Sequence, residues 1–172
     1  QLWDSAKKTG VPNRTYYLEW GLGRPGKVRS ELPPARQGYR KQIDQLEKSA
    51  SALQKEGWPP YPSAEQEEEM QWQYSRLRAT IEKVIEDYVL NQVVQRYSDW
   101  IQVQKLEDVV GFGSSEYEQI KQLYDKCSGV TEAHDKPSAQ TVRVPSPDEL
   151  RQDVRRLNEV IAIIKQRRKG KT

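Results

Sequence analysis

Apolar residues recur at every third or fourth position over most of this chain, and this spacing limits its fold more than any other feature of the sequence. Such spacing places apolar side chains on one stripe of an α-helix. Four segments show it: one from Pro34, one after Pro62, one from Ser115 and one from Ser146. Because four amphipathic helices can cover one another's stripes, we expect a mainly α fold, a helical bundle of about four helices around one core.

Local signals predict where these helices begin and end. Gly57 and the prolines after it should stop the first helix, while the second and longest should run to about Trp100. The third segment opens with the capping-box spacing at Ser115 and should close at Gly129. Residues 129–145 lack periodicity and are predicted to be a loop. Ser146-Pro147 is a strong start for the last helix, because serine can cap and proline suits the first helical position.

The first thirty residues do not share the helical pattern. The aromatic run from Thr15 to Trp20 predicts one short strand. A single strand leaves its edges unpaired, so we expect it to complete a sheet that belongs to sequence upstream of Gln1. The only methionine is Met70. We therefore interpret the chain as the C-terminal piece of a larger protein, with residues 1–30 as the end of an upstream domain or linker and residues 31–172 as a C-terminal helical domain.

Composition narrows the classes of function. Hydrophobic residues make up 35% of the 172 residues and charged residues 31%, which leaves modest core material and favours elongated helices or a partner surface. The single cysteine, Cys127, excludes an internal disulfide framework and is predicted to be a small buried hydrophobe. One histidine and one cysteine cannot form a structural zinc site. With no signal peptide and no apolar run of membrane-spanning length, we expect a soluble cytoplasmic protein.

Charge is distributed unevenly along the chain. A net charge of +3 is too small to indicate nucleic-acid binding from composition. Positive charge gathers at the end of the chain, where an anionic partner would be sought first, although a solvated tail is the commoner explanation. These residues are Lys165, Arg167, Arg168, Lys169 and Lys171.

The sequence contains one formal match to a nucleotide-binding pattern. Residues 21–26 satisfy GxGxxG after the predicted strand, but Pro25 lacks the backbone N–H that a phosphate cradle would use, and no periodic helix follows directly. We interpret these residues as a loop. No GxxxxGK[ST] occurs, so we expect no nucleotide-binding motif within this segment.

Polar residues on the longest helix and in the predicted loop are the candidates for chemistry. Arg78 and Glu82 are four positions apart and should be neighbours at the edge of the apolar stripe. An ordinary i,i+4 ion pair, worth about 0.3 to 0.5 kcal/mol, is the simpler explanation. His134, the only histidine, lies beside Asp135, whose carboxylate could raise the pKa of the imidazole or fix its tautomer. Arg96 extends the polar character along the helix, and a position on the solvated face is its simpler explanation. For His134, in the predicted loop, an exposed or capping role is likewise the simpler explanation.

Several short segments together resemble one known family, the ABC/SMC-like coiled-coil AAA ATPases of bacterial phage defence, which are related to the anticodon nucleases. The resemblance is to the C-terminal region of these proteins. Residues 2–8 and the predicted strand look like the last helix and strand of the ATPase head, which would make residues 1–30 the end of that head. The other segments that carry the resemblance are Leu77 to Val84, Val93 to Tyr97, Lys126 to Ser128 with His134 and Asp135, Pro145 to Leu150, and Arg167 with Arg168.

The resemblance implies a catalytic set. In the anticodon nucleases of this group, an arginine and a glutamate four residues apart, with a downstream histidine, are associated with metal-independent tRNA cleavage. Arg78, Glu82 and His134 match these residue types in that order and become the candidate catalytic residues. Arg96 and Asp135 become candidates for substrate binding. The interval from Glu82 to His134 is longer than in the anticodon nucleases proper, and in this the chain departs from the family pattern.

Two functions follow from the resemblance. The first is the C-terminal effector domain of a defence ATPase, an endoribonuclease that acts on tRNA and is gated by the ATPase head. The alternative is a non-catalytic helical docking, dimerisation or nucleic-acid-binding module of the same ATPase. The expected partners are the upstream ABC-like ATPase domain, tRNA or another nucleic acid, and further copies of the chain, with no membrane. No cofactor is expected in this segment, whereas ATP and Mg²⁺ are expected for the head.

Overall fold

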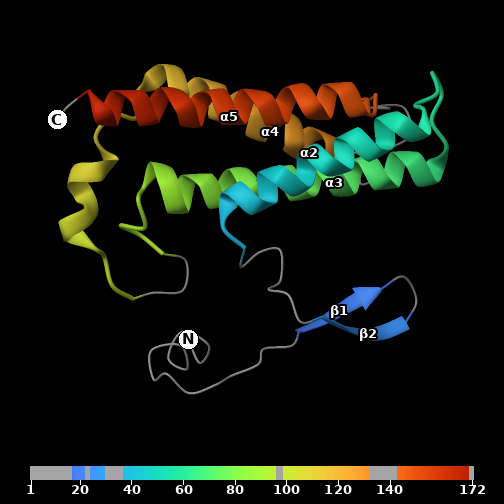
Figure 1. Ribbon diagram of the computed structural model, residues 1–172, viewed down its shortest axis with the longest axis horizontal. Coiled ribbons are helices and arrows are strands. Elements are labelled where there is room, and N and C mark those ends of the chain that lie inside the picture. The colour runs from blue at the N-terminus through green and yellow to red at the C-terminus, as the bar shows by residue number, and fades with distance from the viewer. Residues whose placement is uncertain (1–16, 22–23, 30–36, 96–98, 132–142, 171–172) are drawn as a thin grey trace. The chain divides into compact units, whose positions relative to one another are not determined.

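The computed structural model describes residues 17–21, 24–29, 37–95, 99–131 and 143–170, and it divides the chain into two compact units, residues 1–37 and residues 38–172 (Figure 1). The predicted helical bundle is confirmed in the second unit. Its four long helices are α2 (Tyr39–Glu56), α3 (Ala64–Val84), α4 (Ser114–Thr131) and α5 (Pro147–Lys169). None of the helices in these ranges is both long enough and apolar enough to cross a membrane.

The first unit contains an antiparallel hairpin of β1 (Tyr17–Gly21) and β2 (Arg24–Arg29), in which Leu18 is paired with Val28. The prediction of a loop over residues 21–26 was wrong for Gly21, which ends β1, and for residues 24–26, which begin β2, while residues 22–23 lie outside the described residues. Pro25 is compatible with this strand because a proline can occupy a sheet edge, where no N–H need be donated. The strand β1 thus has a partner in the residues that follow it, and an upstream sheet is not needed to pair that edge. The predicted helix over residues 2–8 lies outside the described residues.

In the second unit, each long helix packs against others through its apolar stripe. α3 contacts α2, α4 and α5, while α5 also contacts α2 and α4, and Figure 1 shows the four helices running roughly along one axis. Burial of a leucine or isoleucine side chain contributes about 1.5 to 3 kcal/mol, so this seam supplies most of the stability of the bundle. Its fully buried apolar members are Leu46, Ala50, Met70, Tyr74, Leu77, Ile81, Val84, Cys127, Leu150, Val154, Leu157 and Ile164.

Capping explains several of the helix ends. α5 begins as predicted, with Ser146 and Glu149 forming a capping box around Pro147. Gly57 ends α2 with a φ of 84°, a conformation that glycine adopts without strain. α4 differs from its prediction at both ends. It begins at Ser114, and it continues through Gly129 to Thr131, because one glycine does not stop a helix whose apolar face is buried.

The helix that was predicted to be the longest, α3, ends at Val84 rather than near Trp100, and α5 is longer than α3. α3 passes into η2 (Ile85–Val89), a single π-helical turn, and Asn91 and Gln92 then have φ values of 43° and 58°. Two successive residues in the left-handed region cannot continue a right-handed helix. A second short element, the 3₁₀-helix η3 (Val103–Val109), lies between the predicted end of this helix at Trp100 and the start of α4.

The C-terminal end of α5 closes this end of the bundle. Arg168 donates hydrogen bonds from Nη1 to the Tyr88 carbonyl at 2.8 Å and from Nη2 to the Val89 carbonyl at 2.9 Å, and its guanidinium lies over the Tyr88 ring. Arg167 forms an ion pair with the buried carboxylate of Glu116 on α4. The basic end is therefore not a simple solvated tail, because two of its arginines bind groups of the bundle itself.

We expect Arg168→Ala to lower the free energy of unfolding by about 1.5 to 3 kcal/mol, because two charge-assisted hydrogen bonds to the end of η2 are lost together. Chemical denaturation followed by circular dichroism would measure the change. Lys165→Ala is the matched control, since Lys165 is an exposed cation one turn earlier on the same helix. Equal losses in the two variants would contradict a specific role for Arg168.

Candidate functional site

Arg78 and Glu82 lie side by side on α3, as their spacing predicted. Arg78 Nε and Glu82 Oε1 are 3.8 Å apart, at the outer limit of an ion pair. The two side chains are 36% and 30% exposed, so they sit at the edge of the core and remain accessible to solvent. At this exposure and distance, the direct ion pair contributes little to stability.

A tyrosine from α4 joins the two charged groups. Arg78 Nε donates a hydrogen bond to the Tyr124 hydroxyl at 3.1 Å, and that hydroxyl donates to Glu82 Oε1 at 3.2 Å. The guanidinium also lies over the Tyr124 ring, with Cζ 5.0 Å from the ring centroid. Both hydrogen bonds are shorter than the direct ion pair. We call these three residues the α3–α4 cluster.

A second polar network, centred on the buried carboxylate of Asp153, lies one turn from Arg78 on α3 and two residues from Tyr124 on α4. Asp153 on α5 accepts a hydrogen bond from the Tyr74 hydroxyl at 2.7 Å and one from Lys126 Nζ, both on Oδ2. Lys126 Nζ also lies 5.5 Å from the centroid of the Tyr74 ring. Burial, followed by the charge of Asp153, raises the pKa of the Tyr74 phenol far above its ordinary value, so Tyr74 stays a neutral donor. The network joins α3, α4 and α5.

Cys127 lies inside the bundle next to Lys126, and the prediction that it is a small buried residue is confirmed. Burial, followed by the charge of Asp153, raises the pKa of the Cys127 thiol to about 12. A thiol with this pKa is protonated throughout the neutral range and is a poor nucleophile. Cys127 is therefore a core residue rather than a catalytic one.

The structure brings together only part of the predicted site. Arg78 and Glu82 are in contact, whereas His134, Asp135 and Arg96 lie outside the described residues. α4 ends at Thr131, three residues before His134 in the sequence. Within the residues that are described, no group of three or more histidine, cysteine or acidic side chains is arranged to hold a metal ion.

Sequence reasoning missed Tyr124 and Asp153. Nothing in the spacing of α4 shows that the Tyr124 hydroxyl meets α3, because that contact depends on how the two helices pair. Asp153 did carry a signal. It stands three residues after Leu150 and four before Leu157, so it interrupts an apolar stripe with a charge, and a charge in that position needs a buried partner.

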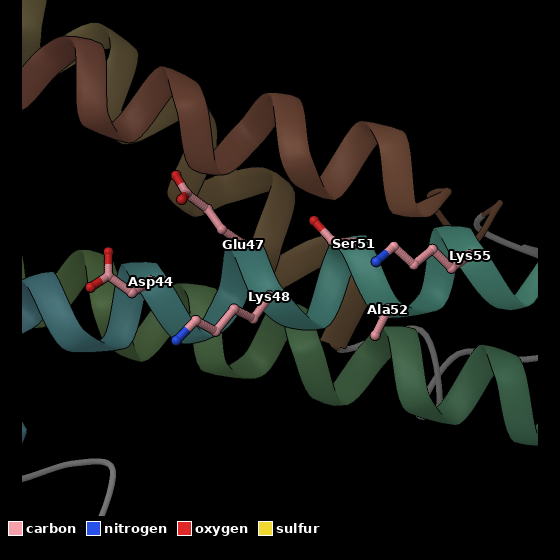
Figure 2. Close-up of a pocket in the computed structure, with 6 residues that line it drawn as sticks. All are labelled: Asp44, Glu47, Lys48, Ser51, Ala52 and Lys55. Atoms are coloured by element: carbon pink, nitrogen blue, oxygen red, sulfur yellow. The ribbon is translucent and has the colours of Figure 1, made fainter.

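A shallow depression on α2 has no residue in common with the α3–α4 cluster (Figure 2). Its lining carries charges of both signs, so it does not favour either an anion or a cation. Part of that lining is already bound by α5, since Asn158 Nδ2 donates to Glu47 Oε1 at 3.1 Å and Arg151 Nη2 donates to Ser51 Oγ at 3.4 Å. The depression is lined by Asp44, Glu47, Lys48, Ser51, Ala52 and Lys55.

We found no match to this chain among protein-family models, curated proteins or solved structures. The α3–α4 cluster is therefore the structural observation from which a function is proposed, together with the resemblance carried by the short motifs.

We expect native Cys127 to react with iodoacetamide at pH 8 at least about 100-fold more slowly than in guanidinium chloride, because only the unfolded thiol approaches its ordinary pKa. Mass spectrometry of timed samples would measure both rates. A rapid reaction of the native protein would show that α4 opens or that the thiol is accessible.

The raised pKa also fixes the direction of a pH effect. Below about pH 8.5 the Cys127 thiol is protonated in both the folded and the unfolded protein, so it adds no pH dependence to the free energy of unfolding there. Above that pH the unfolded thiol ionises first, and stability falls until the pH passes about 12. Cys127→Ala should lack this fall in stability above about pH 8.5. Subtracting its free energies of unfolding, measured by denaturation over a range of pH, from those of the wild type would isolate the contribution of the thiol.

Proposed function

We propose that this chain is the effector domain of a defence ATPase and that it cleaves tRNA without a metal ion, under the control of the ATPase head. The observation that carries the proposal is the α3–α4 cluster, in which a partly exposed arginine and glutamate are held together at the edge of the bundle. This matches the arginine and glutamate of the resemblance in type, order and spacing. A guanidinium at such a place is well suited to bind a phosphate.

The proposed reaction uses the RNA's own nucleophile. The ribose 2′-oxygen attacks the adjacent phosphorus, the bond from phosphorus to the 5′-oxygen breaks, and the products are a 2′,3′-cyclic phosphate and a 5′-hydroxyl. His134 accepts the 2′-hydroxyl proton, and a proton is returned to the leaving 5′-oxygen. Arg78 stabilises the extra negative charge on the phosphoryl oxygens. Glu82 holds Arg78 or acts as the second acid or base, while Arg96 and Asp135 contact the substrate.

The length of the chain allows His134 to take part. Tyr124 and Thr131 are seven residues apart on α4, a helical rise of about 10 Å, and the three residues from Thr131 to His134 span at most about 10 Å when extended. Tyr124 touches both Arg78 and Glu82. The reach of the chain is therefore compatible with a phosphate held between Arg78 and His134.

We expect the protein expressed from its native gene to cleave total tRNA, and Arg78→Ala and His134→Ala each to slow cleavage by at least about 100-fold. The assay is gel electrophoresis of tRNA incubated with and without ATP and Mg²⁺. Analysis of the product ends separates mechanisms, because the 2′-hydroxyl route leaves a cyclic phosphate and a 5′-hydroxyl whereas hydrolysis by metal-activated water leaves other ends.

Arg155→Ala is the matched control, since Arg155 is an exposed arginine on α5 outside the cluster and should leave cleavage unchanged. The proposal fails if the wild-type protein leaves tRNA intact under conditions that stop phage. It also fails if His134→Ala and Arg78→Ala retain full protection.

A second function, dimerisation, is favoured by a separate observation. Five large apolar side chains within eleven residues are exposed, from 49% for Leu106 to 78% for Trp100. Large apolar patches on a protein surface often mark a contact with another protein. Val103, Leu106 and Val110 follow one another at spacings of three and four. We propose that residues 100–110, including η3, form a self-complementary contact with a second copy of the chain. The five side chains are Trp100, Ile101, Val103, Leu106 and Val110.

We expect sedimentation velocity at micromolar concentrations to show a dimer for the wild type and a monomer for the double variant Ile101→Asp, Leu106→Asp, because two buried charges at a contact between copies oppose association. Tyr61→Ser is the control, since Tyr61 is 91% exposed and lies outside this segment. A wild type that sediments as a monomer would rule out dimerisation through these residues.

A further inference from the structure

We infer that Tyr124 is a positioning residue, which holds Arg78 and Glu82 in the relative orientation that RNA cleavage requires. This inference rests on the proposed function and extends it to a residue outside the arginine, glutamate and histidine set. Tyr124 touches both charged groups through one hydroxyl and stacks under one of them. It would act through these two residues rather than on the RNA.

The distances show that the hydroxyl connects the pair. Arg78 Nε and Glu82 Oε1 are 3.8 Å apart, beyond hydrogen-bond range, whereas the Tyr124 hydroxyl is within 3.1 and 3.2 Å of the same two atoms. A phenolic hydroxyl has one proton to donate and lone pairs to accept with. The Tyr124 hydroxyl therefore donates its only proton to the Glu82 carboxylate and accepts the Arg78 Nε–H on a lone pair. A phenylalanine at this position could make neither bond.

These contacts also set how the guanidinium faces a substrate. Nε is turned toward Tyr124, and because the guanidinium is planar and rigid this hydrogen bond also fixes the direction in which the edge that carries the two Nη groups faces. The ring under Cζ restricts rotation of the guanidinium plane. Arginine has many side-chain rotamers, and fixing its plane before the substrate arrives places the positive charge where negative charge develops in the transition state.

The rest of α4 makes Tyr124 a rigid support. The helix is anchored in the core on both sides of this residue, by the buried side chains of Ile120, Leu123 and Cys127. Tyr124 itself is only partly buried, which leaves its hydroxyl at the edge where Arg78 and Glu82 lie. A site is most precise when its supporting residues sit on such a packed helix rather than on a loop. The same helix leads to Thr131 and then, in the sequence, to His134.

The test compares Tyr124→Phe with Tyr117→Phe in the protein expressed from its native gene. Both variants lose one hydroxyl from α4, but Tyr117 is 49% exposed and has no part in the cluster. We expect Tyr124→Phe to slow single-turnover tRNA cleavage by about 10- to 100-fold, with substrate affinity and the thermal unfolding midpoint close to the wild-type values. Tyr117→Phe should match the wild type in all three measurements.

A second measurement reports on position without using activity. In wild-type protein the Arg78 Nε–H should exchange slowly with solvent, as seen in ¹⁵N NMR of the arginine side chains, and Tyr124→Phe should accelerate that exchange while leaving the Arg155 signal unchanged. Unchanged exchange in Tyr124→Phe would overturn the inference whatever the cleavage rate. Cleavage at the wild-type rate in Tyr124→Phe would overturn it while leaving the proposed function standing. Absence of cleavage by the wild type, with Arg78→Ala equally inactive, would instead remove the proposed function and the inference together.

Discussion

One buried carboxylate constrains how three helices of the second unit, α3, α4 and α5, pair with one another. Asp153 accepts hydrogen bonds from Tyr74 and Lys126 on the same oxygen, and so ties α3, α4 and α5 at one level of the bundle. A charge buried without its partners typically costs about 3 to 5 kcal/mol, so a slipped pairing of these helices would be strongly disfavoured. Arg78 follows Tyr74 by four residues, about one turn, and Tyr124 precedes Lys126 by two. The network that sets the helix register therefore also sets the contact between Arg78 and Tyr124.

The other end of the bundle is closed by contacts of a different kind. The π-helical turn η2 and the left-handed residues after it end α3 abruptly, and the carbonyls of Tyr88 and Val89 are bound by Arg168 instead of by a further helical turn. Arg167 is paired with the buried Glu116 beside the start of α4. Cations near the C-terminus of α5 also suit its dipole. Two of the residues that make the sequence look like a basic tail are thus part of the closure of the fold.

The sequence predicted what depends on local chemistry and missed what depends on pairing. The four apolar stripes and the cap at Ser146 are properties of single helices, and both were confirmed. The end of α3 was misplaced because the apolar pattern continues through Val93, and Asn91 is the only residue there with a known preference for the left-handed region. β2 was missed because Pro25 and its neighbouring glycines favour a loop. The i,i+4 spacing of Arg78 and Glu82 predicted that their side chains are neighbours. The contact of Tyr124 with them could not be predicted, because Tyr124 lies 42 residues beyond Glu82 and meets it only through the packing of α3 against α4.

Arg78, Arg167 and Arg168 differ in how strongly the folded structure depends on their contacts. Arg167 faces a carboxylate that is almost fully buried, and Arg168 binds two backbone carbonyls, so removing either guanidinium would take a charged donor away from groups of the fold. Arg78 meets its carboxylate at 3.8 Å across a partly exposed edge and rests on a neutral hydroxyl and a ring. Solvent screens that interaction, so this ion pair contributes less to the stability of the fold than the ion pair between Arg167 and the buried Glu116. Charge along the sequence alone is therefore a poor guide to where a ligand binds, because the arginines in the most basic segment are bound to groups of the bundle itself.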